Sequence, residues 1–313
     1  MDFRLTEDQR ALRDGVRALL TGRFGPEALR AAVARGGRGL DRALWRELGA
    51  AGFFSLRLPE ADGGAGLGLP EAVLAFEEAG RVLLPGPLVA THLAAGRVAG
   101  AADGETVVTA VHGGLVEWLD ESDTVWGDAG DPSGAVAAGA VAAGAVPLTS
   151  VDPLTPLHRI PEDLPAGRFA GPADALAVLL TAAEQLGNAA RTCEAAVQHA
   201  RTREQFGQPI GAFQAVKHLC AGMLVRVELA RAAVYAAAVT ADPVDIAAAR
   251  LLADDAAVRG ARDCLQVHGG MGFTWESDVH LYLKRAWVRA RRGGPVTESE
   301  DVLAEDLIAG TGR

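Results

Sequence analysis

The chain has 313 residues, of which 49% are hydrophobic and only 5% are aromatic. A chain of this length can bury the cores of two or three subdomains, and a core built from Ala, Val and Leu suits close-packed helices. The formal net charge of −10 and the lack of a basic stripe exclude nucleic acid as an expected partner, because nothing would neutralise the phosphates.

Several other classes are excluded by sequence pattern. No run of about 18 apolar residues lacks charges or glycine, so no transmembrane span is predicted. The N-terminal stretch MDFRLTEDQRALRDG is acidic and amphipathic, unlike a signal peptide. Cys193, Cys220 and Cys264 have no CxxC spacing and are expected to be reduced, buried thiols of a cytoplasmic protein. The histidines have no metal-ligand spacing, so no metal site is predicted.

Residues 1–105 are predicted to form an N-terminal helical domain. Thr6 and Gln9 have the spacing of a capping box, which predicts a helix directly after Thr6. Apolar residues then recur at helical spacing, and further helices are predicted over residues 40–51 and 70–82.

The glycine-rich stretch RLPEADGGAGLGLPE (residues 57–71) separates the last two of these helices. It lacks the GxGxxG spacing of a dinucleotide-binding loop, and no βαβ unit surrounds it. We therefore interpret it as a connection before Pro70, which is well placed at a helix start.

Residues 106–168 are predicted to form a reduced middle β region, because short β-favouring runs alternate there with Gly, Asp and Pro. The repeat GAVAAGAVAAGAVPL (residues 134–148) has few side chains to pack, so we expect thin, weakly specified strands along it. Trp118 and Trp126 are interpreted as core aromatics.

Residues 169–313 are predicted to form a C-terminal helical bundle. Its helices are expected at residues 172–203, 211–240, 243–268 and 276–292. The basic run RAWVRARR (residues 285–292) has two open interpretations, cations stabilised by a helix C-terminus or an anion site. The acidic tail, residues 293–313, is interpreted as a solvated or partner-docking segment. The predicted fold is thus mainly α with a truncated β segment.

The stretch RTREQFGQPIGAFQAVKH (residues 201–218) interrupts alanine-rich helix with arginine, phenylalanine, glycine and proline. A guanidinium such as that of Arg203 binds phosphate through a planar, bidentate fork. The adjacent Gly207 allows a ligand to approach the backbone. The stretch therefore predicts contact with something polar and extended.

A second candidate motif, QVHGGMGF (residues 266–273), lies at the end of another predicted helix. Gly269 and Gly270 can present backbone N–H groups where a side chain would block contact. The amides of Gln266 and Gln214 offer both donors and acceptors to the neutral parts of a ligand.

These motifs, together with PEADGGAGLG (residues 59–68) and the order of the three regions, resemble the acyl-CoA dehydrogenase family. In that family both motifs contact the FAD of a neighbouring subunit. The resemblance implies FAD as the cofactor and a cofactor-binding role for Arg203, Gln205, Phe206, Phe213, Gln214, Gln266, Val267, His268, Gly269 and Gly270. For His268, a hydrogen bond to a cofactor phosphate and a structural role at the helix end are both open.

The family's catalytic base has no counterpart in this chain. The base is a glutamate that removes the α-proton of an acyl-CoA while flavin accepts the β-hydride. Its usual position, after the Gly-Gly motif, falls at Gly293, and its position in a minority of members falls at Ala177. The arginine expected next to the latter falls at Val178. Flavin-binding segments of the family's β domain are also missing from the middle region.

This combination resembles the short subunit of heteromeric acyl-CoA dehydrogenases that desaturate steroid side-chain CoA thioesters. The resemblance implies a longer partner that carries the base, a heterotetramer with FAD between unlike subunits, an acyl-CoA substrate and an electron-transfer flavoprotein as acceptor. Two alternatives stay open. One is a non-redox structural or regulatory member, and the other is a homomeric dehydrogenase with Glu298 or Glu300 as base.

Overall fold

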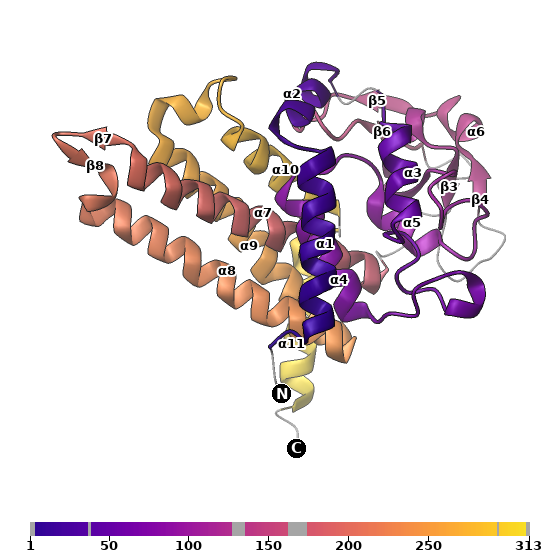
Figure 1. Ribbon diagram of the computed structural model, residues 1–313. Helices are drawn as coiled ribbons and strands as arrows, with labels where there is room; N and C mark the ends of the chain where they lie inside the picture. The colour runs from indigo at the N-terminus through magenta and orange to yellow at the C-terminus, as the bar shows by residue number, and fades with distance from the viewer. Residues whose placement is uncertain (1–3, 37–38, 127–134, 162–173, 293, 311–313) are drawn as a thin grey trace.

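The computed structural model describes residues 4–36, 39–126, 135–161, 174–292 and 294–310. In Figure 1, the N-terminal helices and a small sheet lie to one side of a bundle of long helices. The fold is mainly helical with a small β region, as predicted. Within the described ranges, no helix combines the length and the apolar character needed to cross a bilayer.

The N-terminal part consists of helices joined by short turns. They are α1 (Glu7–Arg23), α2 (Pro26–Ala34), α3 (Arg42–Ala50), the 3-10 helix η1 (Glu60–Asp62), α4 (Leu69–Arg81) and α5 (Leu88–Ala94). The predicted capping box of α1 is present, since the Thr6 hydroxyl accepts from Gln9 N–H at 3.1 Å and the Gln9 amide oxygen accepts from Thr6 N–H at 3.0 Å. α2 and α5 were not expected from the sequence, because helices of 9 and 7 residues give little periodic signal.

The middle part is a six-stranded sheet with the strand order β4-β3-β1-β2-β6-β5. Its elements are β1 (Val108–His112), β2 (Leu115–Glu117), η2 (Leu119–Glu121), β3 (Thr124–Trp126), β4 (Ala135–Ala137), α6 (Ala138–Ala142), β5 (Val146–Leu148) and β6 (Leu157–Arg159). β1 and β3 are parallel and all other neighbours are antiparallel. Trp118 and Trp126 are core residues, as predicted, with 2% and 5% of their surface exposed.

The alanine–glycine repeat differs from its prediction. Strands form at both ends of it, but its centre is the helix α6, which buries Ala138 and Val141. Alanine has the highest helix propensity of all residues, and two buried apolar residues three positions apart lie on one helical face. The expectation of strands throughout was therefore wrong at the centre.

The C-terminal part is the bundle. Its elements are α7 (Ala175–Thr202), β7 (Glu204–Gln205), β8 (Gln208–Pro209), η4 (Ile210–Ala212), α8 (Gln214–Thr240), α9 (Pro243–His268), η5 (Gly269–Phe273), α10 (Val279–Arg292) and α11 (Val296–Gly310). α7 to α10 lie within a few residues of the predicted helices. The acidic tail forms α11, a helix that was not expected, and only its Ser299 is buried among the described residues.

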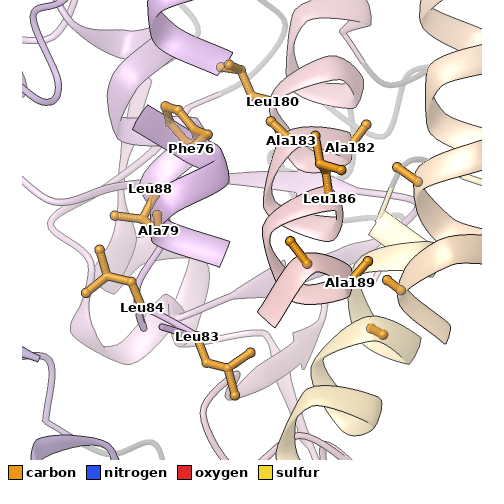
Figure 2. Packing of buried hydrophobic residues seen from close by; sticks show 14 of the residues in the cluster. Phe76, Ala79, Leu83, Leu84, Leu88, Leu180, Ala182, Ala183, Leu186 and Ala189 are labelled. Carbon is orange, nitrogen blue, oxygen red and sulfur yellow. The ribbon is translucent and has the colours of Figure 1, made fainter. Parts of the chain in front are cut away.

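Helices α4 and α7 form the contact between the N-terminal part and the bundle (Figure 2). Phe76 and Ala79 of α4 face Leu180, Ala183 and other apolar side chains of α7 in one continuous core. Glycine permits this approach, because a Cβ on Gly187 would overlap the Glu77 carbonyl oxygen across the contact. The two helix backbones therefore touch.

The cysteines partly match their prediction. All three are free thiols, but only Cys193 and Cys264 are buried, whereas Cys220 is half-buried. Burial raises the pKa of the Cys193 thiol to about 11 and that of Cys264 to about 12. Both therefore stay protonated and unreactive near neutral pH.

Candidate functional site

The first motif forms a hairpin that projects from the end of the bundle (Figure 1). α7 ends at Arg203, whose N–H donates to the His199 carbonyl at 2.8 Å while its own carbonyl accepts from Ile210 N–H at 2.8 Å. β7 and β8 then pair through a two-residue turn, Phe206–Gly207, in which both residues have positive φ (+55° and +78°). Such a turn matches the twist of a hairpin but normally excludes phenylalanine. The hairpin is exposed, and 91% of the Phe206 surface is accessible.

The second motif lies where α9 ends. α9 stops at His268 because Gly269 takes φ +62°, a conformation in which a side chain is strained. A Cβ placed on either Gly269 or Gly270 would meet no atom within 4 Å, so the backbone there faces open space. Gln266 is exposed, whereas Val267 is buried in the core. Val267 can thus reach a ligand only through its backbone.

The structure brings the two motifs together at one end of the bundle. The imidazole rings of His199 and His268 are stacked, with centroids 4.1 Å apart and planes inclined by 21°. This contact joins the last turn of α7 to the end of α9. Phe206 and Phe213 also meet edge to face, with centroids 6.0 Å apart. His199 was missed from the sequence, although its position four residues before Arg203 places both on one helical face.

The residues present fit a flavin nucleotide. Among the described residues, the Arg203 guanidinium has no hydrogen-bond or ion-pair partner, and the side-chain amides of Gln214 and Gln266 have none either. An exposed cation, two amides and open glycine backbone suit a pyrophosphate with neutral groups on either side. These groups lie at one end of the bundle, where the two motifs meet (Figure 1).

Of the two positions expected for a catalytic base, the one within the described residues holds no carboxylate. Ala177 is a buried methyl group in the first turn of α7, and Gly293 lies outside the described residues. Glu298 and Glu300 are exposed on α11, and Ser299 between them points inward and accepts a hydrogen bond from Arg250 at 3.1 Å. An exposed carboxylate lies in water and not in the dry pocket in which the family's base works.

A buried charge cluster lies between α7, α10 and the sheet, and it was not predicted. Arg289 Nη1 donates to Glu117 Oε2 at 2.7 Å, and Arg289 Nε lies 2.9 Å from Glu184 Oε2. Arg285 pairs with Asp152 in the same layer. Burial disfavours the Glu117 carboxylate, but Arg289 and Arg292 outweigh burial and lower its pKa to about 2.

This cluster settles the role of the basic run. Arg285, Arg289 and Arg292 are each at most 7% exposed. Arg289, Arg291 and Arg292 lie in the last turn of α10, as the helix C-terminus interpretation expected, and the three buried arginines pair with carboxylates of the chain itself. The sequence does not reveal these carboxylate partners, because Asp152 lies 133 residues from Arg285 and Glu117 lies 172 residues from Arg289 along the chain.

Comparisons with known proteins identify the family and the fold. The family descriptions "Acyl-CoA dehydrogenase, N-terminal domain" and "Acyl-CoA dehydrogenase, C-terminal domain" match residues 6–104 and 177–304. Acyl-CoA dehydrogenase IpdE2 of Mycobacterium tuberculosis is 40% identical over 294 residues, which are 90% of this chain and 91% of that protein. Acyl-CoA dehydrogenase FadE34 of the same organism is 35% identical over 90% of this chain but only 45% of its own length.

Solved structures give the same result. A chain of the ChsE4-ChsE5 complex from Mycobacterium tuberculosis superimposes with a TM-score of 0.80 at 28% identity and covers 98% of this chain and 99% of that chain. The fold, both motifs and these relatives agree, and FAD is the cofactor of the family that they identify. The chain belongs to the acyl-CoA dehydrogenase family.

Proposed function

We propose that this chain is the short subunit of a heteromeric, FAD-dependent acyl-CoA dehydrogenase and that it completes the FAD site of a longer catalytic partner. The observation that carries the proposal is the end of the bundle, where Gly269 and Gly270 are exposed and, among the described residues, the Arg203 guanidinium has no hydrogen-bond or ion-pair partner. A chain that offers only part of a FAD-binding surface can bind FAD when another subunit supplies the other part.

The roles follow from the chemistry of each group. Arg203 binds the FAD pyrophosphate through its guanidinium fork. Gly269 and Gly270 have no side chain, so the same region of the ligand can approach the backbone there. Gln205, Phe206, Phe213, Gln214, Gln266, Val267 and His268 complete the surface, with Val267 acting through its backbone. When bound, FAD accepts the hydride removed from the acyl chain.

The lack of a base assigns proton abstraction to the partner. The two family positions for the base are Ala177 and Gly293, and neither residue type can take a proton. The only acidic side chain buried on α7 near the sheet, within the described ranges, is Glu184, and Arg289 neutralises it at 2.9 Å. A carboxylate held by a buried arginine is a poor proton acceptor.

An unequal partner is supported by two relatives and by one surface. ChsE4-ChsE5 is described as a complex, and the region similar to this chain makes up less than half of FadE34. α8 in turn exposes Leu224, Val225 and Leu229, each by more than half of its surface. Large apolar side chains gathered on one helix mark a surface that another protein covers.

The substrate class extends the proposal. The family desaturates acyl-CoA thioesters between the α and β carbons, and a steroid side-chain CoA thioester is the expected substrate of this type of complex. An electron-transfer flavoprotein is the expected acceptor. The proposed heterotetramer is a cytoplasmic assembly with two short and two long chains.

The test is flavin absorbance of the chain purified alone and then co-expressed with a longer acyl-CoA dehydrogenase encoded next to it. A colourless chain alone and a yellow, tetrameric complex are expected. Arg203→Ala should strip the flavin from the complex, whereas Arg201→Ala, which removes an equally exposed arginine two residues away, should retain it. Yellow protein without a partner would favour the homomeric alternative with Glu298 or Glu300, and colourless protein in both preparations would favour the non-redox alternative.

A further inference from the structure

The stacked histidines at the junction of the two motifs have a chemistry that the proposed function does not use. His199 is in the last turn of α7 and His268 is the last residue of α9. Both rings are half-buried, and they meet at 4.1 Å. Two stacked imidazoles beside a phosphate-binding arginine can take up one proton when an anion binds.

The hydrogen bonds of His268 define which nitrogen is available. Nδ1 lies 2.8 Å from the Cys264 carbonyl oxygen, so Nδ1 carries the hydrogen and donates it. In the neutral ring Nε2 is then an acceptor, and its lone pair would repel an anion. Protonation of Nε2 converts it into a charge-assisted donor to a phosphate oxygen. An anion at this site therefore favours the protonated ring.

The position of both rings at helix C-termini also favours a positive charge. The last carbonyl groups of a helix carry partial negative charge, which stabilises an imidazolium. Burial acts in the opposite direction and, together with the neighbouring His268 and Arg203, lowers the pKa of His199. An anion bound beside the pair would offset the repulsion from Arg203.

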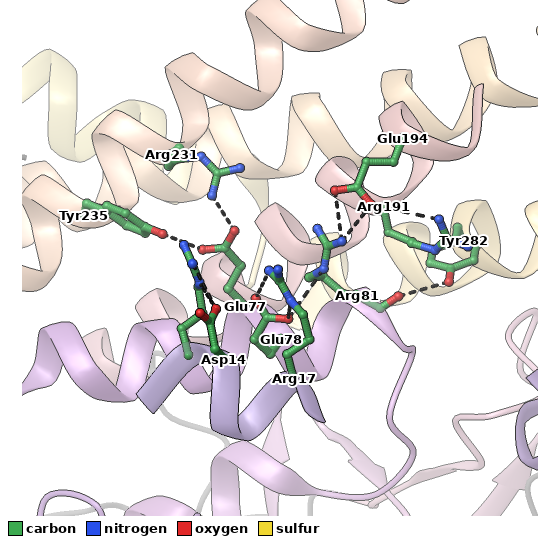
Figure 3. Close-up of polar contacts among 11 residues, drawn as sticks. Asp14, Arg17, Glu77, Glu78, Arg81, Arg191, Glu194, Arg231, Tyr235 and Tyr282 are labelled. Atoms are coloured by element: carbon green, nitrogen blue, oxygen red, sulfur yellow. Dashed lines mark hydrogen bonds and ion pairs between the residues drawn. The ribbon is translucent and has the colours of Figure 1, made fainter. Parts of the chain in front are cut away.

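The charged groups in the cavity beside His268 do not set the charge of the histidine pair. A cavity of about 490 Å³, lined by His268, separates it from α1, α4 and α10. The charged side chains in this cavity are Arg17, Glu78, Arg81, Arg191, Glu194 and Asp278. Five of them form ion pairs with one another, as Figure 3 shows for Arg17–Glu78 and Arg81–Glu194, and Asp278 pairs with Arg30. Cys264 remains a neutral thiol beside the ring.

Resting on the proposed function, we propose that His199 and His268 form a proton-linked clamp on the FAD pyrophosphate. When FAD binds, one proton passes from solvent to an imidazole nitrogen of the pair, and the resulting N–H donates to a pyrophosphate oxygen, which stays anionic. His199 acts as a positioning residue through the stack, and His268 supplies the contact. FAD affinity then falls as pH rises.

The experiment is FAD release from the intact holocomplex, followed by the gain in flavin fluorescence on dilution between pH 6.0 and 8.0. For wild type, one linked proton gives a rise in Kd of up to about tenfold per pH unit above the pKa of the empty pair. His268→Gln retains a polar side chain without a titratable nitrogen, so its Kd should change at most about twofold over the same range. His158→Gln, which removes a histidine of β6 paired with Asp120, should behave as wild type.

The outcomes separate the two proposals. A yellow wild-type complex with the same pH dependence in His268→Gln would overturn the clamp and leave the proposed function intact. A colourless wild-type complex would overturn both. If His268→Gln does not assemble, His268→Asn gives the same test, because it also retains a polar side chain without a titratable nitrogen. Proton uptake, measured by calorimetry in two buffers of different ionisation enthalpy, should be about one per FAD in wild type and close to zero in the variant.

Discussion

At the scale of single residues, Phe206 combines two unfavourable features. It has a positive φ of 55°, which costs a residue with a side chain about 1–2 kcal/mol, and 91% of its large apolar surface is exposed. Neither feature stabilises the isolated chain. Strain that persists at an exposed position points to a functional demand, and the proposed function assigns Phe206 to contact with the cofactor or the partner.

We therefore predict that Phe206→Gly stabilises the isolated chain by about 1 kcal/mol and weakens the complex. Urea unfolding of the chain alone measures the first effect, and flavin content after gel filtration of the complex measures the second. The matched control is Phe213→Leu, at a residue with negative φ, where no gain in stability is expected. Unchanged stability together with full flavin retention in Phe206→Gly would show that the turn has no functional role.

The residues of the candidate site could be picked out from the sequence because they lie in short local stretches, and their cofactor role stays a prediction. Arg203, Phe206 and Gly207 lie in one short stretch whose composition breaks a helix, and the same is true of Gly269 and Gly270. The buried charge cluster is the opposite case. Its pairs join α10 to residues of the middle part more than 130 positions away, and nothing in local spacing indicates which carboxylate meets which arginine.

At the scale of elements, the α4–α7 contact depends on glycine. A Cβ on Gly187 would overlap the backbone of Glu77, and a Cβ on Gly80 would overlap the backbone of Glu184. The two glycines, one on each helix, thus allow the close approach of α4 and α7. A backbone atom cannot rotate away as the end of a side chain can, so the helices themselves would have to separate.

Gly187→Ala is expected to lower the free energy of unfolding by about 1–3 kcal/mol, because overpacking forces backbone shifts in a close-packed core. Gly15→Ala in α1 is the matched control, since its Cβ would meet no atom within 4 Å. There the substitution should stabilise the chain by about 0.5–1 kcal/mol through helix propensity. Thermal unfolding of both variants provides the comparison. Equal effects in the same direction would contradict the close approach of α4 and α7.

The long helices were predictable and the short elements were not. α7 to α10 have long periodic patterns and clear end signals, such as the Asp242 cap before Pro243. α2, α5 and α6 have 9, 7 and 5 residues, and such segments acquire their structure from tertiary packing more than from propensity. α11 was obscured by the acidic composition of the tail.

At the scale of the whole molecule, buried carboxylates join the parts. Glu77 of α4 accepts from Tyr235 of α8 at 2.8 Å and pairs with Arg231, and Glu78 accepts from Arg17 of α1 (Figure 3). Glu117 joins the sheet to α10 in the same way. Removing one partner of such a pair leaves an uncompensated buried charge, so the relative placement of the three parts is strongly specified.

Buried titratable groups also make stability depend on pH. Burial lowers the pKa of His92 to about 4, and burial together with Arg292 lowers that of His112 to about 3. An unfolded histidine titrates near 6.5. Below that pH the unfolded chain binds protons that the folded chain does not, so the free energy of unfolding falls as pH falls. Asp254 opposes this, because burial raises its pKa to about 6 and the folded chain binds its proton first.

A difference between variants isolates one group from this sum. Between pH 6.5 and about 3, His112 contributes a slope of about 1.4 kcal/mol per pH unit to the free energy of unfolding. His112→Gln removes it, so the difference from wild type should be constant above pH 6.5 and shift in favour of the variant by about 2 kcal/mol from pH 6.5 to 5. Urea unfolding at pH 8, 7, 6 and 5 measures it. Parallel curves for the two proteins over this range would mean that His112 is solvated in the folded chain, and the sheet would then not be closed against α10 where Glu117 meets Arg289.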